Sequence, residues 1–128
     1  MHQLDPDLVA VLGAVDKQVA RNTATDGGGQ DLFSDKVFLL SRVEVYGGGE
    51  GTTSGEAPYP YYESMAPSPT DGALDGRIKY VGSSAYGWWL RSPNPANTYT
   101  VRHPGGSGNM SYTYARTSYG VAPAVVIV

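Results

Sequence analysis

The sequence predicts a single small α+β domain with one early helix, a small antiparallel sheet in the C-terminal half and long loops. Three observations lead to this class. A chain of 128 residues fits one domain around one core. Apolar residues recur at helical spacing only near the N-terminus, and short apolar or aromatic runs alternate with Gly- and Pro-rich stretches further on. No internal repeat or interdomain linker interrupts residues 1–128, so we expect one domain.

The first predicted element is an amphipathic helix that begins at Asp5. An Asp caps a helix well, Pro6 suits the first helical position, and the carboxylate of Asp7 favours the positive end of the helix dipole. Apolar residues at helical spacing predict one buried face, with an end near residues 21–22: Leu8, Leu12, Val15 and Val19. A polar loop with three consecutive glycines follows at residues 23–30.

The middle of the chain predicts one strand, one short helix and two loops. The apolar run at residues 36–40 is typical of a buried strand. Ser41 and Glu44 have the spacing of a capping box, so a short helix is expected to begin there. Residues 47–55 and 67–76 are rich in Gly, Pro and Asp and are predicted to be loops. The aromatic cluster at residues 59–62 is expected to place at least one tyrosine in the core.

The remaining strands are predicted in the last third of the chain. Trp88 to Leu90 is predicted to be a strand, and adjacent positions on a strand face opposite sides, so at most one of the two tryptophans should face a given surface. Core packing with a satisfied indole N–H is the expected state of these rings. Further strands are expected near residues 99–102, 110–114 and 121–128, with a glycine-rich turn at residues 105–108.

Composition excludes several classes of function. The net charge is −3 and no basic cluster occurs, so we expect no nucleic-acid partner. The chain has no cysteine, which removes disulfides, thiolate metal sites and Cys nucleophiles. No apolar run approaches the roughly 20 residues of a membrane helix, and no signal peptide is visible, so we expect no membrane insertion.

Two apolar blocks frame a polar stretch whose composition is that of an antibody binding surface. The blocks are residues 87–93 and 120–128, and Tyr, Thr, Ser, Asn and Arg dominate between them. Tyrosine gives a large contact area at low entropy cost, and Ser and Asn give adaptable hydrogen bonds. The same Ser-Tyr-Thr-Tyr pattern is also good β-strand sequence, because aromatic and β-branched residues fit a pleated surface.

An ordered set of motifs resembles a known family. The motifs are SDKVFLLS (34–41), VEVYG (43–47), YPYY (59–62), WWLRSP (88–93) and GVAPA (120–124). In this order they resemble an uncharacterised domain family of gut bacteria and phages, which is similar to the C-type-lectin-fold variable proteins of diversity-generating retroelements. The resemblance implies a C-type-lectin-like fold in the version shared with formylglycine-generating enzymes, with a variable region at about residues 88–128.

The resemblance also implies which residues vary. Retroelement mutagenesis changes template adenines, chiefly in Asn codons, and scaffold residues such as Val101, Met110 and Gly120 separate the residues that such codons can reach. The implied ligand-binding surface consists of Tyr99, Thr100, His103, Ser111, Tyr112, Thr113, Tyr114, Arg116, Thr117 and Tyr119.

No catalytic residue, metal or cofactor is expected. His2 and His103 are the only imidazoles, and no carboxylate pair stands out among Glu63, Asp71 and Asp75. Because no Asp or Glu follows Asp75, a calcium site in the C-terminal third would lack its main ligands. Arg91 is expected to be structural, binding carbonyls or a carboxylate beneath the loops.

The sequence therefore predicts a ligand-binding domain rather than an enzyme. The expected partner is a macromolecule on a target cell, either protein or glycan, and the expected location is a phage tail or a bacterial cell surface. An alternative is a structural module of a phage tail or fibre, in which the same tyrosine-rich face packs against a neighbouring subunit. The binding function and the structural function are both compatible with a homo-oligomer.

Overall fold

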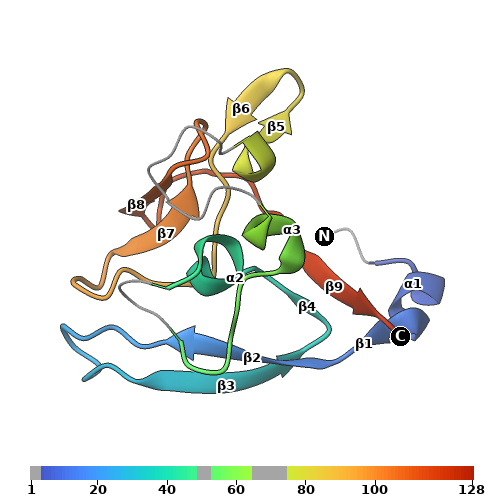
Figure 1. The fold of residues 1–128 in the computed structure, drawn as a ribbon, viewed down its shortest axis with the longest axis horizontal. Helices are drawn as coiled ribbons and strands as arrows, with labels where there is room; N and C mark the ends of the chain where they lie inside the picture. Colours follow the sequence, from blue (N-terminus) through green and yellow to red (C-terminus); the bar gives the residue numbers. More distant parts are fainter. Residues whose placement is uncertain (1–3, 49–52, 65–74) are drawn as a thin grey trace.

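The computed structural model describes residues 4–48, 53–64 and 75–128 and has an α+β fold of short helices and small antiparallel sheets (Figure 1). Parts of the predicted loops at 47–55 and 67–76, including Asp71, lie outside the described residues. The elements are α1 (Pro6–Val11), β1 (Leu12–Gly13), β2 (Val15–Ala20), β3 (Gln30–Asp35), β4 (Val37–Phe38), α2 (Arg42–Tyr46), α3 (Pro60–Glu63), the 3-10 turn η1 (Asp75–Arg77), β5 (Lys79–Val81), β6 (Ser84–Tyr86), β7 (Thr100–Pro104), β8 (Met110–Tyr114) and β9 (Ala124–Ile127).

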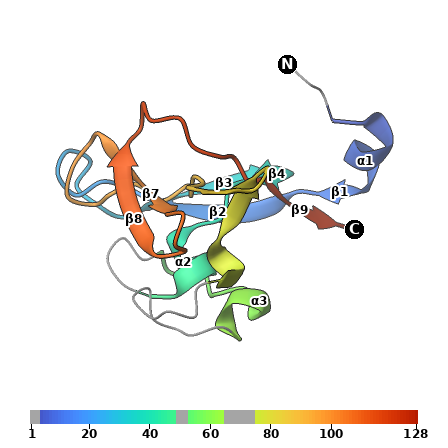
Figure 2. The same ribbon diagram turned by 90° about the horizontal axis from the view of Figure 1, so that it is seen from above.

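Four small sheets form among the described residues, and all their pairings are antiparallel. β9 lies between β1 and β4, so strands from the two ends of the described chain are neighbours. The pairs β2–β3, β5–β6 and β7–β8 are hairpins. Two perpendicular views place α1, β1 and β9 at one end of the molecule and the β7–β8 hairpin at the other (Figures 1 and 2).

The predicted N-terminal helix is wrong over most of its length. Asp5 does cap α1, accepting a hydrogen bond from the Asp7 backbone N–H, but the helix ends at Val11 and buries none of its residues. Residues 15–20 instead form β2, which pairs with β3 in full register. The prediction failed because Val15 and Val19, four residues apart, share a strand face as well as a helix face, and β-branched residues favour the strand.

The capping box at Ser41 is confirmed. The Ser41 hydroxyl accepts from the Glu44 backbone N–H, and the Glu44 carboxylate accepts from the Ser41 N–H at 2.8 Å. α2 then ends at Gly47, whose φ of 81° is costly for any side chain with a Cβ. All five residues of α2 are buried, so this helix is the centre of the fold.

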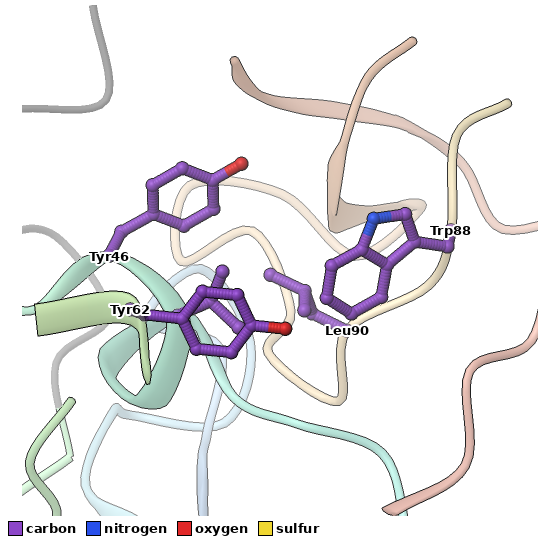
Figure 3. Close-up of a cluster of buried hydrophobic side chains, with 5 residues drawn as sticks. Tyr46, Tyr62, Trp88 and Leu90 are labelled. Carbon is purple, nitrogen blue, oxygen red and sulfur yellow. The ribbon is translucent and has the colours of Figure 1, made fainter. Parts of the chain in front are cut away.

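The hydrophobic core joins α2 and α3 to residues 88–93, which we call the tryptophan segment (Figure 3). It consists of Val45, Tyr46, Tyr62, Trp88 and Leu90. Tyr62 confirms that the aromatic cluster at 59–62 contributes a core residue. Trp88 is also buried, and its indole N–H donates to the Arg77 carbonyl at 2.8 Å, as expected for a core tryptophan.

The tryptophan segment is extended but is not the regular strand that was predicted. Its backbone runs beside β7, with Leu90 N–H donating to Arg102 O at 3.1 Å and Arg102 N–H donating to Ser92 O at 2.9 Å. Only isolated bridges form, at Trp88 and Pro93. Proline has no N–H to donate, which interrupts a ladder. The segment fixes β7 from the side opposite β8.

Arg91 has the structural role that the sequence predicted. Its guanidinium donates to Gln18 O at 2.9 Å and to Leu39 O at 2.6 Å. It also pairs with Glu44 at 2.7 Å and with Glu56. One side chain therefore ties β2, the residues before α2 and the residues before α3 to the tryptophan segment.

Lys17 completes this buried charge network. Its Nζ lies 2.5 Å from the Glu44 carboxylate and donates to the Tyr59 hydroxyl at 2.9 Å. Burial opposes both charges, but the hydrogen bonds outweigh it, so the pKa of Glu44 is lowered and the pKa of Lys17 is raised. Two cations then face two carboxylates, and the network is electrically neutral.

Candidate recognition surface

The β7–β8 hairpin carries most of the residues that the sequence singled out. Thr100 lies opposite Tyr114, and Arg102 lies opposite Tyr112. Residues directly opposite in an antiparallel pair share a face. Among the described strands β8 pairs with β7 alone, so β8 is an edge strand whose side chains reach solvent on both faces.

Three tyrosines and one arginine of this hairpin are exposed together, and we call them the tyrosine–arginine cluster: Tyr99, Tyr112, Tyr114 and Arg116. Tyr99, Tyr112 and Tyr114 are 57%, 54% and 50% exposed. The rings of Tyr99 and Tyr114 stack at 5.6 Å and 23°, and the guanidinium of Arg116 lies 5.1 Å from the Tyr114 ring centre. The rings of Tyr99 and Tyr114 thus support each other while all three tyrosines remain exposed to solvent.

An open cavity of about 420 Å³ lies within this cluster. Tyr99, Tyr114, Ala115 and Arg116 line it. Further along β8, the guanidinium of Arg102 lies 5.1 Å from the Tyr112 ring centre. Arg102 is buried beneath that ring, so the surface combines exposed aromatic faces with one exposed cation, Arg116. Tyrosine and arginine are enriched among the energetic anchor points of protein interfaces.

A second aromatic group forms around Tyr119. Its ring lies 4.5 Å from His103, 5.3 Å from Trp89 and 6.1 Å from Tyr86. Trp89 is half-buried while Trp88 is buried, so the two rings face different sides, as expected for adjacent residues of an extended segment. Tyr119 is half-buried in this group rather than displayed.

Two of the ten predicted binding residues are buried, and their assignment to an exposed surface is wrong. His103 is 4% exposed beneath Tyr119, and burial lowers its pKa, which favours the neutral ring. Its Nδ1 lies 3.0 Å from Pro104 O; a carbonyl can only accept, so the neutral ring carries its proton on Nδ1. Thr100 is 8% exposed, and its hydroxyl donates to Asn97 at 2.7 Å, which fixes the start of β7.

The other eight predicted residues differ in exposure. Exposed side chains belong to Tyr99, Ser111, Tyr112, Tyr114 and Arg116, and half-buried ones to Thr113, Thr117 and Tyr119. On β8, Ser111 and Thr113 alternate with Tyr112 and Tyr114, so the predicted set occupies both faces of the hairpin rather than one surface.

Sequence reasoning missed the β5–β6 hairpin, which adds exposed apolar side chains beside the β7–β8 hairpin. Tyr80 and Val81 are exposed, and Tyr86 meets Tyr119 edge to face. The hairpin signal was Gly82-Ser83 between two short runs, with Gly82 at a φ of 61°. The turn at residues 105–108 lies against this hairpin, because a Cβ on Gly106 would stand 3.4 Å from Ala85 O.

Charge is distributed unevenly along the chain. All 12 acidic residues lie at or before Asp75, whereas five of the nine Lys and Arg residues follow it. The β7–β8 end is built from this acid-free segment. No group of three His, Asp or Glu side chains that could hold a metal ion occurs within residues 4–48, 53–64 and 75–128.

The chain matches the family described as "Domain of unknown function (DUF6273)" over residues 1–128. It belongs to that family. No curated protein and no solved structure matches the chain. In the part of the chain that the structure describes, no helix has the length and apolar character needed to cross a membrane.

Proposed function

We propose that this DUF6273 domain is a recognition domain that binds a macromolecular ligand through the tyrosine–arginine cluster. The observation that carries the proposal is the exposure of Tyr99, Tyr112 and Tyr114 at the end of a hairpin that β7 fixes to the core. Large exposed rings held by ring contacts offer contact area at a low entropy cost. The backbone beneath them is anchored independently, by the bonds between β7 and the tryptophan segment.

The biological setting that we propose follows from the motif resemblance. The domain has a C-type-lectin-like fold and is a variable protein of a phage tail or bacterial surface, diversified by a retroelement. Small antiparallel sheets with short helices are compatible with that fold. Five of the ten residues that Asn-codon mutagenesis would target have exposed side chains, which supports diversification of a displayed surface. The ligand is then a macromolecule on a target cell.

The test is binding to intact cells. Fluorescently labelled protein is incubated with a panel of gut bacteria and measured by flow cytometry. The variant Tyr99→Ser/Tyr112→Ser/Tyr114→Ser is expected to lose binding to any strain that the wild type labels, because exposed aromatic anchors carry most of an interface's energy. Tyr61→Ser is the matched control, since Tyr61 is an equally exposed tyrosine on α3. Equal labelling by the triple variant and the wild type would refute the proposal.

An exposed apolar surface at the other end favours assembly as a second candidate function. Leu8 and Val11 of α1 and Ile127 of β9 are exposed close to the β1–β9 pairing. Exposed apolar side chains mark contacts with other proteins where they form a continuous patch. Light scattering over a range of protein concentrations decides the matter: assembly predicts a mass above 13.6 kDa that falls in Leu8→Ser/Ile127→Ser, whereas a monomeric mass in both proteins argues against it.

A further inference from the structure

The guanidinium of Arg116 is positioned by a ring and is not neutralised. It lies over Tyr114, and Arg116 forms no salt bridge among the described residues. Arg21 is also exposed, but it forms an ion pair with Asp31 at 3.4 Å. Arg116 therefore retains donors for an acceptor that another molecule supplies.

The segment that builds this surface has no carboxylate that could pair with Arg116. Residues 76–128 contain no Asp or Glu, and the cavity beside Arg116 is otherwise lined by Tyr99, Tyr114 and Ala115. A carboxylate matches a guanidinium better than a neutral acceptor does, because it can take two parallel N–H bonds and its charge is opposite. The ligand atom that suits this position is a carboxylate oxygen.

The other residues that line the cavity indicate which group of the ligand stands next to that carboxylate. Tyr99 and Tyr114 present stacked aromatic surface to an open cavity of about 420 Å³, a size within the range of pockets that hold a compact apolar group. An apolar or aromatic side chain packed there would remove ring surface from water. The matching ligand therefore has a carboxylate next to an apolar group.

A protein segment fits this description better than a glycan. Protein interfaces are enriched in Tyr and Arg and depleted in Lys, Asp and Glu, and the tyrosine–arginine cluster has that composition. Sugar hydroxyls are donors as well as acceptors. A guanidinium accepts no hydrogen bond, and the cluster has no carboxylate to receive sugar donors.

We infer that the ligand of the tyrosine–arginine cluster is a protein segment in which an Asp or Glu, bound by Arg116, stands beside an apolar side chain that packs on Tyr99 and Tyr114. This inference rests on the proposed function and names the class of ligand. Arg116 confers the preference for an acidic segment, and the two tyrosines supply contact area.

The experiment uses a displayed library of random 12-residue peptides, selected on the immobilised wild-type domain. We expect enriched peptides to contain Asp or Glu near an apolar residue. Their affinity should fall about tenfold in Arg116→Gln and further in Arg116→Glu. Lys36→Gln is the charge-matched control, because Lys36 is exposed on the chain between β3 and β4, and it should bind as the wild type does. Replacing the peptide's acid by its amide should remove the effect of Arg116→Gln, since the two changes act on one contact.

Three outcomes would overturn the inference, and they separate it from the proposed function. Enriched peptides that lack acidic residues, or that bind Arg116→Gln as well as the wild type, contradict the role of Arg116. If such peptides still lose binding in Tyr99→Ser/Tyr114→Ser, the recognition surface stands and only the ligand class is wrong. If they bind this tyrosine variant unchanged, the proposed function fails as well. Binding of the wild type to a glycan array, with no enrichment of acidic peptides, would identify the glycan as the ligand instead.

Discussion

The Arg91 guanidinium lies 2.7 Å from the Glu44 carboxylate, and the two side chains are only 9% and 3% exposed. Glu44 also caps α2, and Arg91 belongs to the tryptophan segment that supports β7. The pair therefore connects the helix at the centre of the fold to the segment that fixes β7, the strand beneath the tyrosine–arginine cluster. The charged arginine in the WWLRSP motif thus supports the fold.

The first prediction concerns this pair. Arg91→Met should lower the free energy of unfolding by about 3–5 kcal/mol, because it leaves the carboxylates of Glu44 and Glu56 buried with one fewer cation. Arg21→Gln removes an exposed ion pair and should cost less than about 1 kcal/mol. Urea denaturation measures both. Similar losses in the two variants would show that the buried network contributes no more than a surface pair.

The second prediction concerns the dependence of stability on pH. The folded pKa of Glu44 is lowered from 4.5, so its contribution is complete above that value and is lost as pH falls through the folded pKa. The folded pKa of Lys17 is raised from 10.5, so its contribution is complete below that value and is lost as pH rises through the folded pKa. Burial also lowers the pKa of His103 from 6.5, so stability begins to fall below that pH, and it raises the pKa values of Tyr46 and Tyr62 from 10.0, so stability begins to fall above that pH. Denaturation at a series of pH values should therefore give a plateau between about pH 6.5 and 10.

Lys17→Met tests the alkaline side of this prediction. Removing the amine should make the alkaline decrease smaller, and the buried tyrosines Tyr46 and Tyr62, whose pKa values burial raises from 10.0, should supply the decrease that remains. The plateau should also be lower, because Glu44 loses one partner. An alkaline decrease of unchanged size in Lys17→Met would assign it to other groups.

The third prediction distinguishes the two tryptophans. Trp88→Ala should cost about 3–5 kcal/mol, because the ring is buried in the core and its N–H is bonded to Arg77 O. Trp89→Ala should cost clearly less, since its ring is half-buried against His103 and Tyr119. Chemical denaturation of the two variants gives the comparison. If Trp89→Ala is the more destabilising change, the core has been assigned to the wrong ring.

Sequence reasoning found the features whose signals are local. The capping box at Ser41, the cap at Asp5 and the turn at residues 105–108 each depend on a few neighbouring residues, and each is present. Three strands of the C-terminal third were also found near their predicted positions. The structural role of Arg91 was predicted as well, although its partners were not.

The features that depend on tertiary pairing were not predictable. Residues 15–20 became a strand because Gln30 to Asp35 pair with them, and the polar sequence of β3 gave no strand signal. His103 and Thr100 fit the pattern of diversified residues, but burial depends on Tyr119 and Asn97, which reach them through the fold. Codon reasoning selects residue types, whereas exposure is a property of the folded chain.

The most direct test of the account is the stability of a domain whose tyrosine–arginine cluster has been replaced. In Tyr99→Ser/Tyr112→Ser/Tyr114→Ser/Arg116→Ser the free energy of unfolding, measured by urea denaturation, should stay within about 2 kcal/mol of the wild type, because exposed substitutions change it by about 0.5 kcal/mol each. His103→Ser/Tyr119→Ser is the contrast, and it should cost more because it empties a buried contact. A folded quadruple variant means that the fold does not need these side chains, which is what a displayed binding surface requires. A quadruple variant that unfolds would mean that these side chains hold the hairpin in place, and the recognition surface would be an ordinary part of the fold.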